Sequence, residues 1–313
     1  MKSAVNTLLR KRKRSDFEVL KKELPLHIML LPAVAIILIY SYGPMLGSVI
    51  AFQNFSPAKG IFRSEWVGWD NFNRLFSLLN FKQVLLNTIS ISLQKMVWGI
   101  VIPVIFASLL NEVANKIFKK VFQTLIYVPN FLSWIILAGI MTDILSPSGG
   151  IVNQILSHFG IEPIFFLGDP EYFQGTIIVT DIWQRFGFGT VVYLASLTGI
   201  DLSLYESAQM DGANRWQQTL HITLPGLKPI IVLMTILSMG SVLNAGFDQI
   251  FNMYSPQVYE TGDILDTLIY RLGMEQAQFA LATAAGLFKS AISFVLVVGS
   301  YYLADKFADY RVF

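Results

Sequence analysis

The amino-acid sequence predicts an all-α, polytopic membrane protein with six transmembrane helices and both termini in the cytoplasm. Three observations lead to this prediction. First, 54% of the 313 residues are hydrophobic and 14% are charged, whereas soluble globular proteins carry about 25% charged residues. Second, six apolar stretches are long enough to cross a hydrocarbon layer. Third, the basic residues are concentrated in alternate connections between these stretches, as the positive-inside rule requires.

The composition also excludes several classes of protein. A formal net charge of +2 and a low charged fraction do not fit a nucleic-acid binder or an ordinary soluble enzyme. The chain has no cysteine, which excludes disulfides, iron–sulfur clusters and thiolate chemistry. Its three histidines are far apart in the sequence, so they do not predict a metal site.

The six predicted spans follow from length and hydropathy. A transmembrane helix needs about 20 mostly apolar residues to cross a core of about 30 Å. The stretches that meet this requirement are residues 28–51, 87–110, 121–145, 176–200, 229–253 and 281–304. Pro32, Pro44, Pro103 and Pro129 lie within or beside them. We expect these prolines to be tolerated, because neighbouring helices can satisfy the freed carbonyl groups.

Residues 1–27 form a basic segment ahead of the first span. Basic residues at 11–14 and 21–22 precede an apolar stretch that is long enough to span, without a clear signal-peptidase site. We therefore expect a retained first helix and a cytoplasmic anchor, rather than a nucleic-acid-binding patch. Residues 28–313 are predicted to form a single transmembrane domain.

The distribution of Lys and Arg predicts the orientation. With a cytoplasmic N-terminus, 15 of the 23 basic residues lie on the cytoplasmic side, five in external connections and three within spans. The connection 146–175 contains neither Lys nor Arg, so it is the clearest external segment. Residues 66–76, also external, have aromatic residues at helical spacing. This pattern fits either a helix at the membrane interface or a packed loop cap.

The connection between the fourth and fifth spans carries the most specific pattern. Residues 201–228 are amphipathic, with apolar residues at intervals of three to five positions. Gly212 interrupts the pattern, so we predict a short helix, a tight turn and a second helix. Pro225 and Pro229 are expected to mark the entry to the fifth span. Such an element can place its apolar side in a groove of another protein or rest on lipid headgroups.

This loop resembles the cytoplasmic signature of permease subunits of ATP-binding-cassette importers, which has the form E-A-A-x-x-D-G-A followed by I-x-L-P. The thirteen residues from Gly212 to Pro225 match the family spacing. Ser207 departs from the usual alanine, and Thr219 stands where phenylalanine is common. The positions that fill the signature are Glu206, Ser207, Ala208, Asp211, Gly212, Ala213, Ile222, Leu224 and Pro225.

The resemblance covers most of the chain, including residues 30–61, 246–271 and 282–294. It is closest to the carbohydrate-uptake branch, among oligosaccharide-type permeases similar to the maltose-importer membrane subunits. The resemblance implies a multi-pass protein of the bacterial cytoplasmic (inner) membrane that works among membrane lipids. It further implies a second permease subunit, two cytoplasmic ATPase subunits, an extracytoplasmic solute-binding protein and an oligosaccharide substrate, and no nucleic acid.

The resemblance also implies that residues 201–228 form coupling helices that dock on the ATPase. Glu206 is expected to make a polar or ionic contact there, and Gly212 to supply the turn. The coupling residues that it implies are Glu206, Ser207, Ala208, Asp211, Gly212, Ala213 and Trp216. The chain has no Walker motif. We therefore predict a transport subunit without enzymatic activity or cofactor of its own, with ATP and Mg bound by the partner ATPase.

Polar and charged residues within the spans are candidates for the substrate pathway. An ionisable residue inside a span costs roughly 2.5–3.5 kcal/mol and usually faces the bundle interior or a water-filled cavity. Sugar sites combine apolar walls with a few convergent polar groups. The candidates are Gln94, Lys95, Trp98, Trp183, Gln184, Arg185, Asn244, Asp248, Gln249 and Lys289. Each aromatic has an alternative role in packing, and Arg185 can instead neutralise Asp181, four residues earlier.

An excess of buried cations over anions would suit a carboxylate-bearing substrate, and we hypothesise uronic-acid oligosaccharides, alginate fragments among them. The alternative interpretation is an ion-driven secondary transporter or an intramembrane enzyme. Either would need a cluster of buried acids or a metal-binding set. The spans offer only the scattered Asp143, Asp181 and Asp248.

Overall fold

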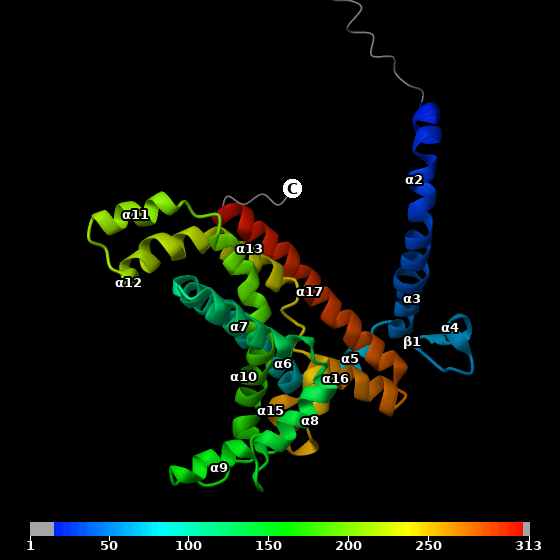
Figure 1. The fold of residues 1–313 in the computed structure, drawn as a ribbon. Coiled ribbons are helices and arrows are strands. Elements are labelled where there is room, and N and C mark those ends of the chain that lie inside the picture. Colours follow the sequence, from blue (N-terminus) through cyan, green and yellow to red (C-terminus); the bar gives the residue numbers. More distant parts are fainter. Residues whose placement is uncertain (1–15, 309–313) are drawn as a thin grey trace, which may run out of the picture.

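The computed structural model describes residues 16–308 and shows a helical bundle with one long helix standing apart from it (Figure 1). Within these residues, 4 helices are long and apolar enough to cross a membrane, and 2 bent helix pairs bring the candidate spans to 6. They follow the order of the six predicted spans. The predicted all-α, six-span fold class is therefore confirmed. The side of the membrane on which each end lies stays a prediction.

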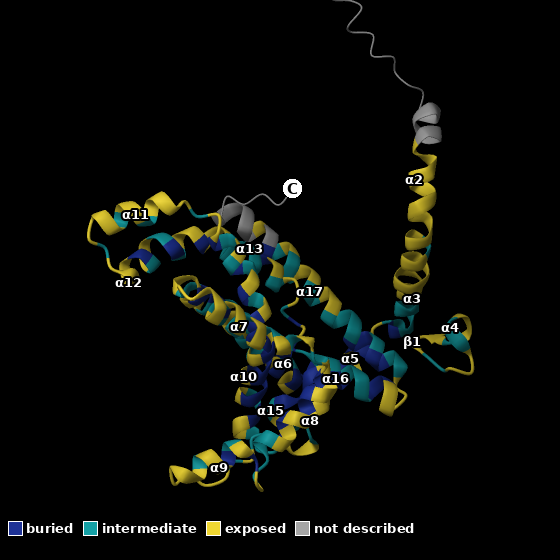
Figure 2. Cartoon of the chain, viewed as in Figure 1, coloured by how far each residue is buried: buried dark blue, intermediate teal, exposed yellow. Residues whose placement is uncertain are grey.

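The first candidate span covers Glu23–Phe52 and stands apart from the bundle (Figure 1). Its apolar window is 0% buried, and Figure 2 shows it as almost continuously exposed. The basic residues at 11–14 lie outside the described part of the chain. The span is built from α2 (Asp16–Ile37), a π turn at Leu38–Tyr42, α3 (Gly43–Met45) and a 3-10 turn at Leu46–Phe52.

A small cap joins the first span to the second. In it, β1 (Gln53–Asn54) pairs antiparallel with β2 (Glu65–Trp66), and α4 (Gly60–Arg63) and α5 (Asp70–Phe76) flank the pair. The Phe52 ring lies 5.6 Å from the Trp66 ring and 5.5 Å from the Trp69 ring, between centroids. Asn71 Nδ2 donates to the carbonyl oxygens of Ala51 and Gln53, at 2.9 Å each. Residues 66–76 combine a helix, α5, packed through Phe72 and Leu75 with exposed aromatic side chains at Trp66 and Trp69, so both alternatives for this segment stay open.

Two long helices, α6 (Phe81–Glu112) and α10 (Pro170–Leu197), pack along each other at the centre of the bundle. A buried apolar cluster joins them to α8 (Trp134–Leu145) and α14 (Phe247–Met253). Fully buried members from the four helices are Ile91, Leu137, Ile177 and Ile250. Figure 2 shows burial concentrated here, because these helices cover one another's apolar faces.

The third predicted span differs from the structure. Instead of one helix over 121–145, the chain forms α7 (Lys116–Tyr127) and α8, bent by 106° across a break of a few residues. Pro129 lies in a 3-10 turn at Val128–Phe131, and the chain is extended at Leu132 and Ser133. A proline has no N–H to donate and its ring disfavours a helix through the preceding turn. The helix therefore ends here instead of tolerating Pro129.

The fifth predicted span is also displaced. A continuous helix covers Arg215–Met239, formed by α12 (Arg215–Gln218), a π turn at Thr219–Thr223 and α13 (Leu224–Met239). Pro225 and Pro229 therefore lie inside this helix and do not mark its start. After Met239 the chain turns through residues 240–246, and α14 follows. Gly246 has a φ of 94°, a conformation that glycine adopts without steric cost.

The remaining helices complete the connections. The segment between the third and fourth spans contains α9 (Ile151–His158), and α11 (Leu202–Met210) follows α10 at a bend of 76°. Between α14 and the last span lie α15 (Tyr259–Gly262), α16 (Leu265–Tyr270) and a π turn at Arg271–Glu275. The last helix is α17 (Phe279–Ala308).

Candidate functional site

A cavity of about 420 Å³ lies where α6, α10 and the break in the fifth span meet. We call it the charged cavity, because its wall contains Lys95, Asp181 and Arg185. The non-helical segment after α13 lines the other side, with Ser241, Val242, Asn244, Ala245 and Gly246. Irregular backbone at membrane depth is tolerated where protein covers it or where it faces a water-filled space. The break in the fifth span fits this condition.

Two cations of this cavity share one carboxylate. The Oδ1 atom of Asp181 lies 3.4 Å from Lys95 Nζ and 3.2 Å from Arg185 Nε. The side chains of Lys95 and Asp181 are 9% and 8% exposed, whereas that of Arg185 is 59% exposed. The predicted pairing of Arg185 with Asp181 is therefore present, but Lys95 uses the same acid. The wall carries one more positive than negative charge.

Lys95 also fixes the broken fifth span in place. Its Nζ donates to the carbonyl oxygen of Ala245 at 2.8 Å and to Gln249 Oε1. Gln249 Nε2 in turn donates to the Ile177 carbonyl oxygen at 2.8 Å and to Thr180 Oγ1 at 2.9 Å. A Cβ at Gly246 would lie 3.0 Å from Lys95 Nζ, so any other residue there would require the ammonium group to shift by a few tenths of an ångström. These bonds tie α14 to both α6 and α10.

A second cavity, of about 780 Å³, lies between α16 and α17. We call it the aromatic cavity. Its lining includes the aromatic rings Phe247, Tyr270 and Phe279 and an ion pair in which Lys289 Nζ lies 2.5 Å from Asp266 Oδ1. Asn244 lines both cavities. Asn244 is therefore the residue of the turn at 240–246 that the two cavities have in common.

The structure separates the ten predicted pathway residues into three groups: residues that line a cavity, a residue behind a cavity, and residues that line neither cavity. Lys95, Arg185 and Asn244 line the charged cavity, and Asn244 and Lys289 line the aromatic cavity. Gln249 lies behind the charged cavity as the partner of Lys95. The remaining five line neither cavity: Gln94, Trp98, Trp183, Gln184 and Asp248.

The residues outside the cavities have other surroundings. Gln94 bonds to Ser90 within its own helix at 3.1 Å, and Gln184 donates to the Leu132 carbonyl oxygen at 3.3 Å. Trp98 and Trp183 are 45% and 40% exposed. Sequence reasoning missed Phe247 and Tyr270. No local signal identifies them, because their role depends on how the broken span folds back.

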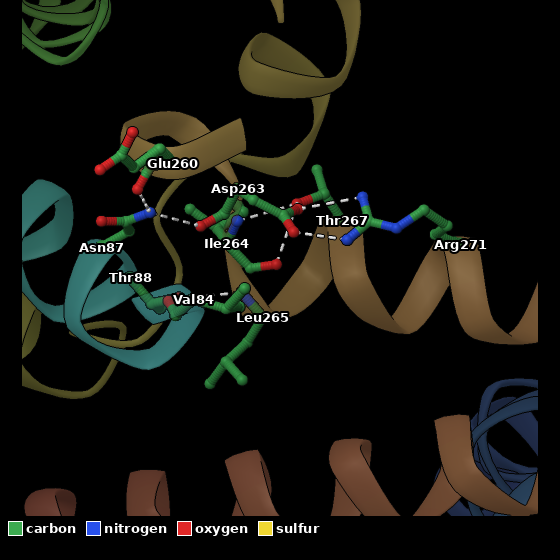
Figure 3. A network of polar contacts seen from close by, with 9 residues as sticks. All are labelled: Val84, Asn87, Thr88, Glu260, Asp263, Ile264, Leu265, Thr267 and Arg271. Carbon is green, nitrogen blue, oxygen red and sulfur yellow. Dashed lines mark hydrogen bonds and ion pairs between the residues drawn. The ribbon is translucent and has the colours of Figure 1, made fainter. Parts of the chain in front are cut away.

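A second charged cluster lies where α6 meets α15 and α16 (Figure 3). Arg271 pairs with the buried carboxylate of Asp263, and the guanidinium lies 4.7 Å above the centre of the Tyr259 ring. Thr267 Oγ1 donates to Asp263 Oδ1 at 2.7 Å and accepts from the Ile264 N–H at 2.9 Å. Asn87 Nδ2 donates to the carbonyl oxygens of Glu260 and Asp263. The negative charge of Asp263 balances the positive charge of Arg271, so this cluster carries no net charge.

The connection 201–228 forms the predicted helix, turn and helix. Asp201 caps α11, with Oδ1 accepting the Ser203 N–H at 2.9 Å. This hydrogen bond holds the pKa of the Asp201 carboxyl below its ordinary value. Gly212 lies at the turn with a φ of 80°, and Asn214 and Gln217 form a capping box that starts α12.

Two side-chain contacts hold the helix pair α11 and α12 in place. Arg215 lies 3.1 Å from Glu112, at the end of α6, and the hydroxyl groups of Tyr205 and Thr223 lie 2.9 Å apart. Its outer surface is exposed at Glu206, Ser207, Asp211, Gly212 and Trp216, with Ala208 and Ala213 partly buried. Apolar side chains on this surface are uncovered: Leu202 at 73%, Met210 at 88% and Trp216 at 71% exposure. Contiguous exposed apolar groups of this kind mark interaction surfaces.

Comparison with known proteins identifies the chain. It is similar to the polygalacturonan/rhamnogalacturonan transport system permease protein YteP of Bacillus subtilis (strain 168), with 40% identity over 97% of this chain and 94% of that protein. A solved structure of a bacterial ABC transporter involved in import of the acidic polysaccharide alginate has a chain with a TM-score of 0.86. That chain is 38% identical, over 93% of this chain and 98% of its own length.

A second structure, a bacterial alginate ABC transporter in complex with an alginate pentasaccharide-bound periplasmic protein, gives the same TM-score of 0.86. It is 37% identical, over 94% of this chain and 98% of that chain. Within the described residues, no group of three or more His, Cys, Asp or Glu could hold a metal ion. Residues 99–309 match a family of transport membrane subunits. The chain belongs to this family, the binding-protein-dependent transport system inner membrane components, and is a permease subunit rather than an enzyme.

Proposed function

We propose that this permease imports acidic oligosaccharides, through a path formed with a second permease and driven by two partner ATPases that bind ATP and Mg. An external solute-binding protein delivers the sugar. The similarity to YteP and to an alginate importer supports this proposal, because the names of both refer to polymers of acidic sugars. The structure of the alginate importer with its sugar-bound periplasmic protein supports the delivery step.

The observation that carries the proposal is the charge of the charged cavity. Asp181 is the only carboxylate among its lining residues, while Lys95 and Arg185 are both cationic. The buried Lys95 is held by Asp181, Ala245 and Gln249, so its charge is largely satisfied. Arg185 is bonded through Nε and leaves the rest of its guanidinium exposed. A planar guanidinium is suited to bind a carboxylate with two parallel hydrogen bonds.

The aromatic cavity supplies the complementary surface. Aromatic rings offer flat apolar faces to the C–H groups of a sugar, and a few polar groups fix its orientation. Phe247, Tyr270 and Phe279 provide such faces, and Asn244 can both donate and accept hydrogen bonds. Because Asn244 lines both cavities, a sugar chain leaving the aromatic cavity would meet Arg185 next.

The substrate proposal is tested with the complex of permeases and ATPases in proteoliposomes, together with its binding protein. A uronic-acid oligomer is compared with a carboxyl-reduced oligomer of the same length, which has the same linkages without the charge. We expect stimulated ATP hydrolysis and uptake with the acidic oligomer. A preference for the neutral oligomer would overturn the proposal.

The second part of the proposal is that residues 201–228 couple this permease to an ATPase. The residues involved are Glu206, Ser207, Ala208, Asp211, Gly212, Ala213 and Trp216. The exposed apolar groups of α11 and α12 support this role, since nothing within the described residues covers them. A Cβ at Gly212 would meet no atom within 4 Å, so a side chain has room there. The backbone has a φ of 80°, however, and this left-handed conformation is the reason that the position favours glycine.

Two substitutions separate backbone conformation from bulk at Gly212. Gly212→Val makes the left-handed conformation unfavourable by roughly 1–2 kcal/mol or more, whereas Gly212→Asn tolerates it. We expect the valine variant to stay in the membrane but to lose ATPase association and uptake, and the asparagine variant to keep most of both. Normal transport by the valine variant would show that the turn does not couple the subunits.

A further inference from the structure

The helix α7 has the clearest separation of faces among the helices near the coupling loop. Ile117, Val121 and Leu125 follow one another at intervals of four and are 77%, 54% and 64% exposed. Three lysines lie on the opposite side of the same helix: Lys116, Lys119 and Lys120. On a helix with 3.6 residues per turn, this spacing places an apolar stripe opposite a basic stripe.

The bundle covers little of α7. Only Ile126 is buried, at 9% exposure, and its carbonyl lies against Gly187 of α10, where a Cβ would approach to 2.0 Å. The bend of 106° between the α7 segment and α8 means that α7 is not the straight continuation of a spanning helix. It extends away from the path of α8 with its apolar stripe uncovered.

In the described part of the chain, the three lysines form no ion pair with an acidic residue. The sequence has no Asp or Glu between Glu112 and Asp143, and Glu112 already pairs with Arg215 at 3.1 Å. Within the described residues, no ion pair involves Lys116, Lys119 or Lys120. An amphipathic helix with basic residues on its polar face is suited to the interface of an anionic membrane. Each such lysine adds attraction to anionic headgroups.

We propose that α7 is a binding site for anionic phospholipids of the cytoplasmic leaflet. Its apolar stripe lies among the acyl chains, and Lys116, Lys119 and Lys120 bind the headgroup phosphates. The Glu112–Arg215 pair joins the end of α6 to α12, and α7 begins four residues after Glu112. The lipid site is therefore next to the coupling loop. Its assignment to the cytoplasmic leaflet rests on the proposed coupling role of that loop.

The first experiment measures lipid retention by native mass spectrometry on the complex of permeases and ATPases. The lipids are phosphatidylglycerol and phosphatidylcholine with identical acyl chains. We expect the wild type to retain phosphatidylglycerol preferentially, and the triple variant Lys116→Gln, Lys119→Gln, Lys120→Gln to lose roughly tenfold or more of that preference. The matched control, Lys59→Gln, Arg63→Gln, Lys82→Gln, changes three exposed basic residues elsewhere and should keep it. Equal loss in both variants would overturn the proposal.

The second experiment locates the apolar stripe. The chain has no cysteine, so Leu125→Cys and Gln123→Cys each carry a single fluorescent label, on the apolar and polar sides of α7. Brominated phosphatidylglycerol should quench the label at 125 more strongly than the label at 123. Absence of quenching at 125, with cross-linking of that cysteine to the second permease, would show that a protein covers the stripe. Neither readout requires transport, so failure of the proposed function and failure of this site are distinguishable.

Discussion

The described residues contain two clusters in which a buried aspartate meets a cation, and the clusters differ in charge balance. In the Asp263 cluster, one acid pairs with Arg271 and accepts a hydrogen bond from Thr267 (Figure 3). The Arg271 guanidinium also lies over the Tyr259 ring. In the Asp181 cluster, one acid serves both Lys95 and Arg185, and a cavity lies beside it. The Arg271 side chain is 14% exposed, whereas the Arg185 side chain is 59% exposed.

This difference separates a structural role from a role in binding. An ion pair without net charge, whose other hydrogen bonds are also formed, holds helices against each other. In the Asp263 cluster these helices are α6, α15 and α16. A cluster with a surplus positive charge at a cavity keeps a binding capacity for an anion. The following predictions test whether the two clusters divide the roles in this way.

The largest effect on stability is expected for Asp263→Ala. The substitution leaves Arg271 mostly buried without its carboxylate, and removing one partner of a buried pair costs roughly 3–5 kcal/mol. The thermal midpoint of the purified complex should fall steeply, and little folded protein should be recovered. Any protein that remains should discriminate acidic from neutral oligomers as the wild type does. A shift in that discrimination would give the Asp263 cluster a part in binding.

A smaller loss of stability is expected for Asp181→Asn. Lys95 keeps its bonds to Ala245 and Gln249, so about 1–3 kcal/mol is lost rather than the full cost of an isolated charge. The cavity gains one positive charge, and the KM for an acidic oligomer should fall relative to that for its carboxyl-reduced counterpart. An unchanged KM ratio would indicate that the charge of the cavity does not reach the substrate.

Thr267→Val should have the smallest effect on stability of the three. It removes a donor to Asp263 and the acceptor of the Ile264 N–H, at a cost of about 1 kcal/mol. Thr124→Val is the matched control: its exposed hydroxyl donates only to the Lys120 carbonyl oxygen, within the helix. The thermal midpoint should drop for the first variant and stay near the wild-type value for the second. Equal midpoints would mean that the Thr267 bonds add nothing to the cluster.

The sequence was sufficient for the number and order of the spans and for the helix, turn and helix of residues 201–228, because these depend on local patterns. Hydropathy identifies long apolar helices whatever they pack against, and Gly212 with its flanking residues determines the turn locally. The breaks in the third and fifth spans were not predictable in this way. Residues 121–145 and 229–253 are mostly apolar with scattered polar residues, and a hydropathy pattern does not distinguish a straight helix from one that folds back.

The candidate cavities depend on those breaks, which explains the partial prediction of their residues. Lys95 and Arg185 were identified because a charge inside a span is costly wherever it lies. Phe247 and Tyr270 look like ordinary apolar residues in the sequence, and only the turn at residues 240–246 brings them to the aromatic cavity. Trp98 and Trp183 line neither cavity and are 45% and 40% exposed, so their place in the substrate pathway stays a prediction.

The most direct test of the account is the selectivity of Arg185→Gln in the reconstituted complex. The measured quantity is the ratio of kcat/KM for a uronic-acid oligomer to that for its carboxyl-reduced counterpart, with Arg63→Gln as a control at an exposed arginine away from the cavities. Arg185 is largely exposed, so stability should change by less than about 0.5 kcal/mol. The ratio should fall roughly tenfold through the loss of one charge-assisted bond. An unchanged ratio in a normally folded, transporting complex would contradict the claim that the surplus positive charge of the charged cavity selects acidic sugars.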